Sequence, residues 1–231
     1  MALYALGDTH LSLGSNKAMD VFGGGWEGYV DKLRDGFAAV NDEDTVVLCG
    51  DLSWGMSLSE AKRDFEFLDR ELPGEKWLLK GNHDYWWTTA LKMNAFFAEN
   101  EFHRLHILHN NCAFYGDDIA LCGTRGWVFE EDAGPQSQKV FNRELMRLET
   151  SLKAAGERDR YCFLHYPPLY RGYRCQEIID LLERYEVKGC YYGHLHGPSH
   201  RLAISGMQGN VDYHLVAADY IGFCPKKILD S

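Results

Sequence analysis

The stretch Leu78–Asp84, which reads Leu-Leu-Lys-Gly-Asn-His-Asp, decides the fold that we predict for this chain. Its apolar start follows a Pro-Gly pair, and a short apolar run bounded by turn residues is typical of a buried strand. Gly81 allows a sharp turn at the strand's carboxyl end, where open α/β sheets gather their ligands. Asn82 then offers an amide oxygen to a metal, and His83 faces a substrate while Asp84 hydrogen-bonds its far ring nitrogen. The alternative is an ordinary polar turn after a core strand.

The same arrangement recurs at four other places along the chain. Short apolar segments at 2–6, 45–49, 161–164 and 189–192 are each followed by glycine, aspartate or histidine. Helices are expected around the first three strands, at 26–40, from 57 to 72 and at 88–99. This alternation of strands and helices predicts α/β architecture with parallel strands.

The second half of the chain has a different pattern. Residues 105–122 predict two or three short strands with a hairpin turn at Gly116-Asp117-Asp118. Helices are expected at 140–155 and 175–185. We expect residues 211–216, and those after 217, to close the structure as antiparallel strands.

The five strand ends together carry a set of potential metal ligands and proton donors. In chain order they are Asp8 and His10, then Asp51, then Asn82, His83 and Asp84, then His165, then His194 and His196. Each fragment alone is common by chance, but two aspartates, one asparagine and four ligand histidines are too many for one ion and suit two that share a carboxylate. Nitrogen and oxygen donors without cysteine favour transition metals, with Mn, Fe or Zn expected, over Mg or Ca and exclude a thiolate zinc site.

In this order the motifs resemble those of the calcineurin-like metallophosphoesterase superfamily, whose pattern is D-x-H, G-D, G-N-H-D/E, H and G-H-x-H. All five blocks occur between residues 7 and 196. The blocks G-D-x-S-W, G-N-H-D-Y-W-W and G-T-R-G-W most resemble a group of short, uncapped bacterial members. The resemblance implies that residues 1–231 form a single metallophosphoesterase domain. It also implies an α/β fold, a four-layer α/β/β/α sandwich of two mixed sheets flanked by helices.

The resemblance also implies how the ligands are shared between two metal ions. By analogy Asp8, His10, Asp51 and His196 bind one ion, whereas Asp51, Asn82, His165 and His194 bind the other, with Asp51 bridging. Two branches of the superfamily are disfavoured. Purple acid phosphatases have a tyrosine where this chain has Trp54, and the arginines that protein Ser/Thr phosphatases carry after two of the motifs are missing.

Two cations roughly 3.5–4 Å apart lower the pKa of a bridging water and hold a phosphate ester for in-line attack by the resulting hydroxide. We expect His83 to protonate the leaving oxygen, with Asp84 holding its ring. The expected function is hydrolysis of a small soluble phosphate ester, with monoester and diester both open. The alternatives are a phosphodiesterase or nuclease acting on nucleic acid, and a non-catalytic binding scaffold on the same fold.

Weaker signals concern the substrate. Arg125 is a candidate clamp for the substrate phosphate because a guanidinium fork matches phosphate oxygens, although it could equally pack on Trp127. Trp54 and the run Tyr85-Trp86-Trp87 could form an aromatic rim for a base or sugar ring, or simply cover the core.

Composition limits the setting and the partners. The chain of 231 residues has a formal net charge of -10, which disfavours a broad nucleic-acid footprint and leaves a small phosphorylated substrate as the expected partner. Seven cysteines without a C-x-x-C pair indicate reduced thiols. Asp8 and His10 leave no room for a cleavable signal peptide, and no apolar stretch approaches the ~20 residues of a membrane span. We therefore expect a cytoplasmic location without membrane association. The oligomeric state is not predicted.

Overall fold

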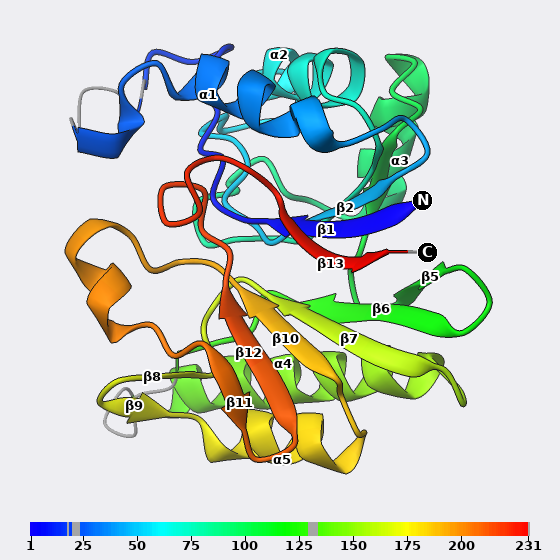
Figure 1. Ribbon diagram of the computed structural model, residues 1–231. Coiled ribbons are helices and arrows are strands. Elements are labelled where there is room, and N and C mark those ends of the chain that lie inside the picture. Colours follow the sequence, from blue (N-terminus) through cyan, green and yellow to red (C-terminus); the bar gives the residue numbers. More distant parts are fainter. Residues whose placement is uncertain (18, 20–23, 129–133, 231) are drawn as a thin grey trace.

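Two β-sheets face each other, and helices cover the outer face of each (Figure 1). The computed structural model describes residues 1–17, 19, 24–128 and 134–230. From one side to the other, the layers are α1–α3, a five-stranded sheet, a six-stranded sheet, and α4 with α5. This confirms the predicted α/β fold, a four-layer α/β/β/α sandwich of two mixed sheets.

The first sheet is built mainly from the amino-terminal half of the chain. Its strand order is β13-β1-β2-β3-β4, and β1 to β4 are parallel whereas β13 is antiparallel to β1. The strands are β1 (Ala2–Leu6), β2 (Thr45–Leu48), β3 (Glu75–Leu78), β4 (Leu105–Ile107) and β13 (Lys226–Asp230). The helices on this side are α1 (Tyr29–Gly36), α2 (Lys62–Glu66) and α3 (Ala90–Glu99).

The second sheet has the order β11-β12-β10-β7-β6-β5. Its strands are β5 (Cys112–Tyr115), β6 (Ile119–Thr124), β7 (Asp159–Leu164), β10 (Gly189–Tyr192), β11 (Gly206–Gln208) and β12 (Val211–Leu215). Helices α4 (Gly134–Ala154) and α5 (Gln176–Arg184) cover its outer face, and a small hairpin joins β8 (Leu169–Tyr170) to β9 (Tyr173–Arg174). The expectation that 211–216 is purely antiparallel is wrong: β12 is antiparallel to β11 but parallel to β10.

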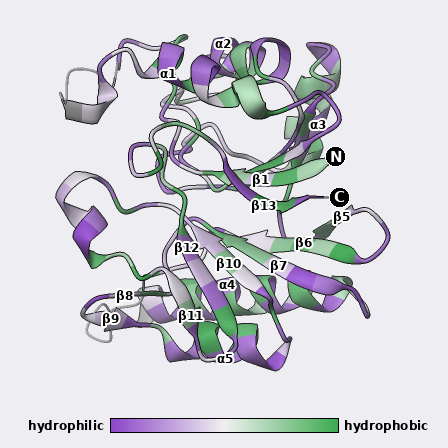
Figure 2. Cartoon of the chain, viewed as in Figure 1, coloured by the Kyte–Doolittle hydropathy of each residue, from purple (hydrophilic) through white to green (hydrophobic). Residues whose placement is uncertain are grey.

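Alternate residues of each central strand enter different hydrophobic cores. In β1, Tyr4 and Leu6 pack toward the helices of the first layer, whereas Leu3 and Ala5 pack between the two sheets. In the second sheet Phe163 of β7 likewise faces the other sheet, while its neighbours face α4 and α5. Because both faces are covered, β1 is apolar along its whole length and β7 is apolar over its buried carboxyl-terminal half. Figure 2 shows the contrast between the green β1 and the largely purple α1 and α2.

Helix boundaries differ from the predicted ones. The helix expected at 26–40 contains only α1 as a regular α-helix, with short 3-10 segments at Gly24–Trp26 and Phe37–Ala39. The helix expected from 57 to 72 begins at Lys62 and ends in a π-helical turn, Phe67–Glu71. In contrast, α4 begins six residues before the expected position. None of the helices in the described part of the chain is long and apolar enough to cross a membrane.

Candidate metal centre

The carboxyl ends of parallel strands from both sheets bring the predicted ligands into one cluster. Gly7 joins the sheets, because its N–H donates to Val216 O at 2.7 Å and its carbonyl accepts from Ala218 N at 2.9 Å. Asp8 and His10 follow β1, and Asp51 follows β2. Ligands that follow strands of different sheets therefore lie together where the carboxyl ends of the two sheets meet.

Side-chain atoms of the predicted ligands approach one another closely. His196 Nε2 lies 3.2 Å from Asp8 Oδ1 and 3.4 Å from His10 Nε2. His165 Nε2 lies 2.7 Å from the amide oxygen of Asn82. Seen as potential ion sites, one group consists of Asp8, His10 and His196, and a second of Asp8, Asp51 and His165. The ligand atoms of each group lie within 4.8 Å of one another.

The shared carboxylate of these two groups is Asp8, whereas the resemblance implies that Asp51 bridges. Asp51 also reaches both sides of the cluster, since its Oδ2 lies 3.8 Å from His10 Nε2 and 3.6 Å from His165 Nε2. His194 is held through its backbone, whose N–H donates to the Asp8 carboxylate at 3.0 Å. Its ring centroid lies 5.1 Å from that of His165. The structure therefore brings together all seven side chains predicted as ligands.

The backbone is strained at the same positions. The φ angles of Asp8, His10, Asp51 and His194 are 61°, 44°, 53° and 74°, in the left-handed region that residues with side chains rarely adopt. Such strain persists only where the surrounding structure fixes it, and it concentrates at functional sites. Gly81 has no room for a side chain, because an added Cβ would lie 2.1 Å from Asp51 Oδ1. The fold therefore holds the ligand-bearing turns in place at an energetic cost.

Asp84 does not hold the ring of His83, and this expectation is wrong. Both oxygens of this buried carboxylate instead accept hydrogen bonds from five other donors. These are the backbone N–H groups of Asp51, Leu52, Ser53 and Gly81, and the indole N–H of Trp86. Asp84 therefore ties the turn after β3 to the turn after β2. Trp86 is buried and donates to Asp84, and it does not belong to an aromatic rim. We call Asp84 with its five donors the Asp84 brace.

His83 is half-buried at the border of the cluster. Its backbone N–H donates to Asp51 Oδ1 at 2.7 Å, which fixes its position relative to a predicted ligand. The ring lies over Trp54, with a centroid distance of 4.5 Å, and Nδ1 lies 3.4 Å from the Tyr85 hydroxyl. Burial, followed by the nearby histidines and Lys17, lowers the pKa of His83. The ring is therefore free of the ligand cluster but directly beside it.

Asp219 supports the cluster and is absent from the predicted set. Its Oδ1 lies 2.9 Å from His196 Nδ1, which leaves Nε2 of the same ring directed at Asp8. His165 is oriented in a similar way by the Cys49 carbonyl, 3.1 Å from its Nδ1. Such partners orient metal-binding histidines and raise their basicity. The sequence did hold a signal, because Asp219 directly follows the apolar run 215–218, much as Asp8 and Asp51 follow apolar strands and a glycine.

Electrostatics indicate that this cluster suits cations. Burial and the neighbouring Asp8 carboxylate raise the pKa of Asp51 to about 8. Burial lowers the pKa of His10 to about 3 and that of His194 to about 4, which keeps both rings neutral and able to donate lone pairs. Burial alone would lower the pKa of His196, but Asp8 and Asp219 raise it to about 10. Two buried carboxylates repel each other, and bound cations would relieve that repulsion. The donor set therefore fits the predicted transition metals.

A cavity of about 610 Å³ opens beside the cluster. Its walls include the predicted ligands His10 and His196, the candidate proton donor His83, and the rings of Trp26 and Trp54. Trp54 thus takes part in an aromatic lining, which was one of the two expectations for this residue.

Arg125 lines a different cavity, and the expectation that it packs on Trp127 is confirmed. Its guanidinium lies over the Trp127 ring at 4.9 Å and 3.9 Å from Glu144 Oε1. The Arg125 carbonyl accepts from His165 N at 3.1 Å, so the residue adjoins the cluster through its backbone. A role in binding phosphate remains a prediction.

Comparisons with known proteins agree with this fold. A model of the calcineurin-like phosphoesterase family matches residues 1–198 of the 231-residue chain. The structure of a protein of unknown function from Aquifex aeolicus superposes with a TM-score of 0.52 at 13% identity, covering 98% of this chain and 95% of that one. A second solved structure gives a TM-score of 0.55 at 13% identity, with coverage of 91% and 88%. At these identities the likeness shows the fold alone. No curated protein matches the chain.

Proposed function

This chain belongs to the calcineurin-like phosphoesterase family, and from that premise we propose that it is a dinuclear-metal hydrolase of a small phosphate ester. Family membership and the Asp/His groups support metal-dependent phosphoester hydrolysis in general. The observation that carries the finer proposal is the convergence of seven nitrogen and oxygen ligands from five strand ends. Four protein ligands per ion, with one carboxylate shared, match that number.

The chain supplies the metal ligands and fixes their geometry. Asp8, His10, Asp51 and His196 would hold one ion, and Asn82, His165 and His194 would complete a second site with Asp51. When bound, two such cations supply an activated water and neutralise charge on the phosphate. Other residues fix the ligands in position. Asp84 hydrogen-bonds the turns after β2 and β3, and Asp219 orients the His196 ring so that its Nε2 faces Asp8.

His83 is the proposed proton donor to the leaving oxygen. Its ring borders the aromatic cavity and lies tilted against the Trp54 ring, and its own backbone N–H is hydrogen-bonded to Asp51. The oxygen that departs would lie beside the His83 ring. Trp26 and Trp54 favour an apolar or ring-shaped part of the substrate in the cavity next to it.

A comparison of two substrate types tests the proposal. The protein is loaded with Mn²⁺ and assayed on a phosphomonoester and on a phosphodiester, each with and without chelator. We expect turnover of at least one that chelator abolishes and Mn²⁺ restores. Metal-loaded protein that hydrolyses neither ester would contradict the proposal and favour a binding scaffold.

A cytoplasmic location is part of the same proposal. The seven cysteines form no disulfide, and five of them are buried. Burial raises the pKa of the Cys122 thiol well above its usual value and that of the Cys175 thiol to about 11, which keeps these two thiols protonated and unreactive. Inert buried thiols in this number support a reducing compartment.

A further inference from the structure

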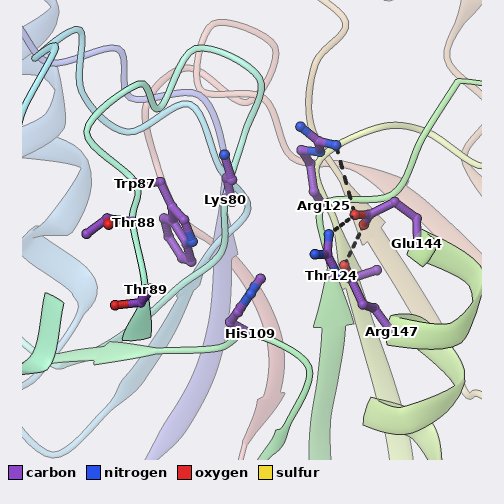
Figure 3. A pocket seen from close by; sticks show the side chains of 9 residues that line it. All are labelled: Lys80, Trp87, Thr88, Thr89, His109, Thr124, Arg125, Glu144 and Arg147. Atoms are coloured by element: carbon purple, nitrogen blue, oxygen red, sulfur yellow. Dashed lines mark hydrogen bonds and ion pairs between the residues drawn. The ribbon is translucent and has the colours of Figure 1, made fainter. Parts of the chain in front are cut away.

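A second cavity, of about 400 Å³, lies between the two halves of the sandwich and is strongly basic (Figure 3). We call it the basic pocket. Lys80, Trp87 and His109 line it from the side of the first sheet, and Arg125 and Arg147 from the side of the second. Apart from Arg125, the candidate clamp for the substrate phosphate, none of these residues has been given a role in the hydrolysis.

The basic pocket carries more positive charge than its own acid can neutralise. Lys80, Arg125 and Arg147 face a single carboxylate, that of Glu144. That carboxylate is already engaged, because it accepts from Thr124 Oγ1 at 2.8 Å and from Arg147. Within the described residues Lys80 makes no ion pair. A local excess of cations on a chain with a net charge of -10 indicates a site for an anion.

Unused donors point to the same ligand. Arg125 Nε and Trp87 Nε1 are buried and have no hydrogen-bond acceptor among the residues that the structure describes. Buried donors without partners are rare in native proteins and call for an explanation such as a bound ligand or water. An oxyanion offers acceptors for both N–H groups as well as a charge for the neighbouring cations.

Helix α3 adds to the positive potential. Thr89 caps its first turn by accepting from Lys92 N at 3.4 Å, and both Thr88 and Thr89 line the basic pocket. The first turn of α3 contains no acidic residue. The partial positive charge at the start of this ten-residue helix therefore remains available to an anion.

The basic pocket adjoins the proposed metal centre. Lys80 lies two residues before Asn82, a backbone span of at most about 7 Å. On the other wall the Arg125 carbonyl accepts from Tyr166 N at 2.9 Å as well as from His165 N. Tyr166 in turn lies against His194, with ring centroids 4.5 Å apart. The basic pocket and the proposed metal centre are therefore neighbours, as a small molecule bound to both would require.

From these observations we infer that the basic pocket binds a second oxyanion group of the substrate, a phosphate or a carboxylate, while the scissile phosphate lies at the metal centre. The inference rests on the proposed function and extends it to a substrate class: small phosphate esters with two anionic groups. Hydrolysis breaks only the ester bond at the metal centre, and the group in the basic pocket is released unchanged.

Anion binding is tested first without catalysis. Chelator-treated protein is titrated with inorganic phosphate by calorimetry, and Lys80→Met and Arg147→Met are compared with Lys92→Met and Arg143→Met. The two control residues are exposed, and Arg143 lies one turn before Arg147 on α4. We expect the pocket variants to bind phosphate about tenfold more weakly, as for a lost charge-assisted hydrogen bond, and the controls to match the parent protein. Equal binding by all five folded proteins would overturn the site.

Kinetics then test the substrate class. Mn²⁺-loaded protein is assayed on 3-hydroxypropyl phosphate, 3-carboxypropyl phosphate and propane-1,3-diol bisphosphate, with longer spacers in the same three series. We expect the anionic substrates to have a lower KM, and Lys80→Met to raise their KM about tenfold more than that of the hydroxyl compound. A comparison of KM between the carboxylate compound and the bisphosphate identifies which oxyanion the basic pocket prefers.

The outcomes separate the two proposals. Turnover of all three compounds with one common KM would overturn the second-anion inference and leave the proposed hydrolase intact. No turnover of any compound, together with phosphate binding that depends on Lys80 and Arg147, would overturn the hydrolase and support the anion site.

Discussion

Replacement of Asp84 by asparagine distinguishes a structural brace from a proton relay. Oδ2 of Asp84 accepts from Asp51 N at 2.9 Å and from Gly81 N at 2.7 Å, and Oδ1 accepts from three further donors. The introduced amide has one oxygen, and it loses fewer hydrogen bonds when this oxygen takes the place of Oδ1 and accepts from those three donors. Its NH₂ group then takes the place of Oδ2 and faces Asp51 N and Gly81 N. Two buried N–H groups then lose their acceptor, at about 1–3 kcal/mol each. We therefore expect Asp84→Asn to lower the free energy of unfolding by about 2–6 kcal/mol.

Urea denaturation of the chelator-treated protein measures this loss, and the matched control is Asp69→Asn. Asp69 is also buried, but its Oδ1 accepts from one backbone donor, Arg104 N at 2.8 Å, which an asparagine oxygen can still serve. The control should therefore lose clearly less stability than Asp84→Asn. If Asp84→Asn unfolds at the same urea concentration as the control yet loses turnover, Asp84 acts on the chemistry of His83 and the brace is refuted.

Three further predictions concern metal affinity, turnover and pH. Asp219→Asn should weaken Mn²⁺ binding about 10–100-fold in a chelator competition, because His196 loses its orienting carboxylate. The control is Asp212→Asn, which changes a carboxylate 2.9 Å from His214 Nε2 in β12, and this variant should bind Mn²⁺ as tightly as the parent protein. If Asp219→Asn and Asp212→Asn bind Mn²⁺ with equal affinity, the role of Asp219 is refuted. His83→Ala should keep two metal ions per chain by elemental analysis but lose most turnover, whereas loss of an ion would make His83 a ligand. Burial lowers the pKa of Lys76 from 10.5 to about 7. The unfolded chain therefore holds a proton that the folded one lacks between those pH values, and stability from this residue rises with pH across that window by up to about 5 kcal/mol. In denaturation curves measured at pH 7 and pH 10, Lys76→Met should reduce the increase in the free energy of unfolding between the two pH values. An increase equal to that of the parent protein would contradict the prediction.

The sequence predicted best the segments whose local pattern is strongest. Strands β1 and β10 have the predicted bounds, because each is an apolar run that ends at a glycine. The alternation of strands with helices correctly predicted that each of them pairs with parallel neighbours, β1 with β2 and β10 with β7. The carboxyl ends of parallel strands meet at one edge of a sheet. This is why the seven predicted ligands lie together although up to 188 residues separate Asp8 from His196.

Features that depend on tertiary contacts were missed or misjudged. The direction of β12 could not be predicted, because β12 pairs with β10 across a connection that contains β11 and looks the same in sequence as a simple hairpin. Proximity along the chain suggested that Asp84 serves the ring of His83, but the turn after β2 supplies nearer donors. The basic pocket draws Lys80 from the end of β3 and Arg147 from α4, which no sequence spacing connects.

Anomalous X-ray diffraction from crystals soaked in Mn²⁺ tests the central claim most directly. The account predicts two anomalous peaks roughly 3.5–4 Å apart, with Asp51 between them, His10 and His196 on one side and His165 and His194 on the other. A single peak, or peaks away from these side chains, would contradict a dinuclear centre built from both sheets.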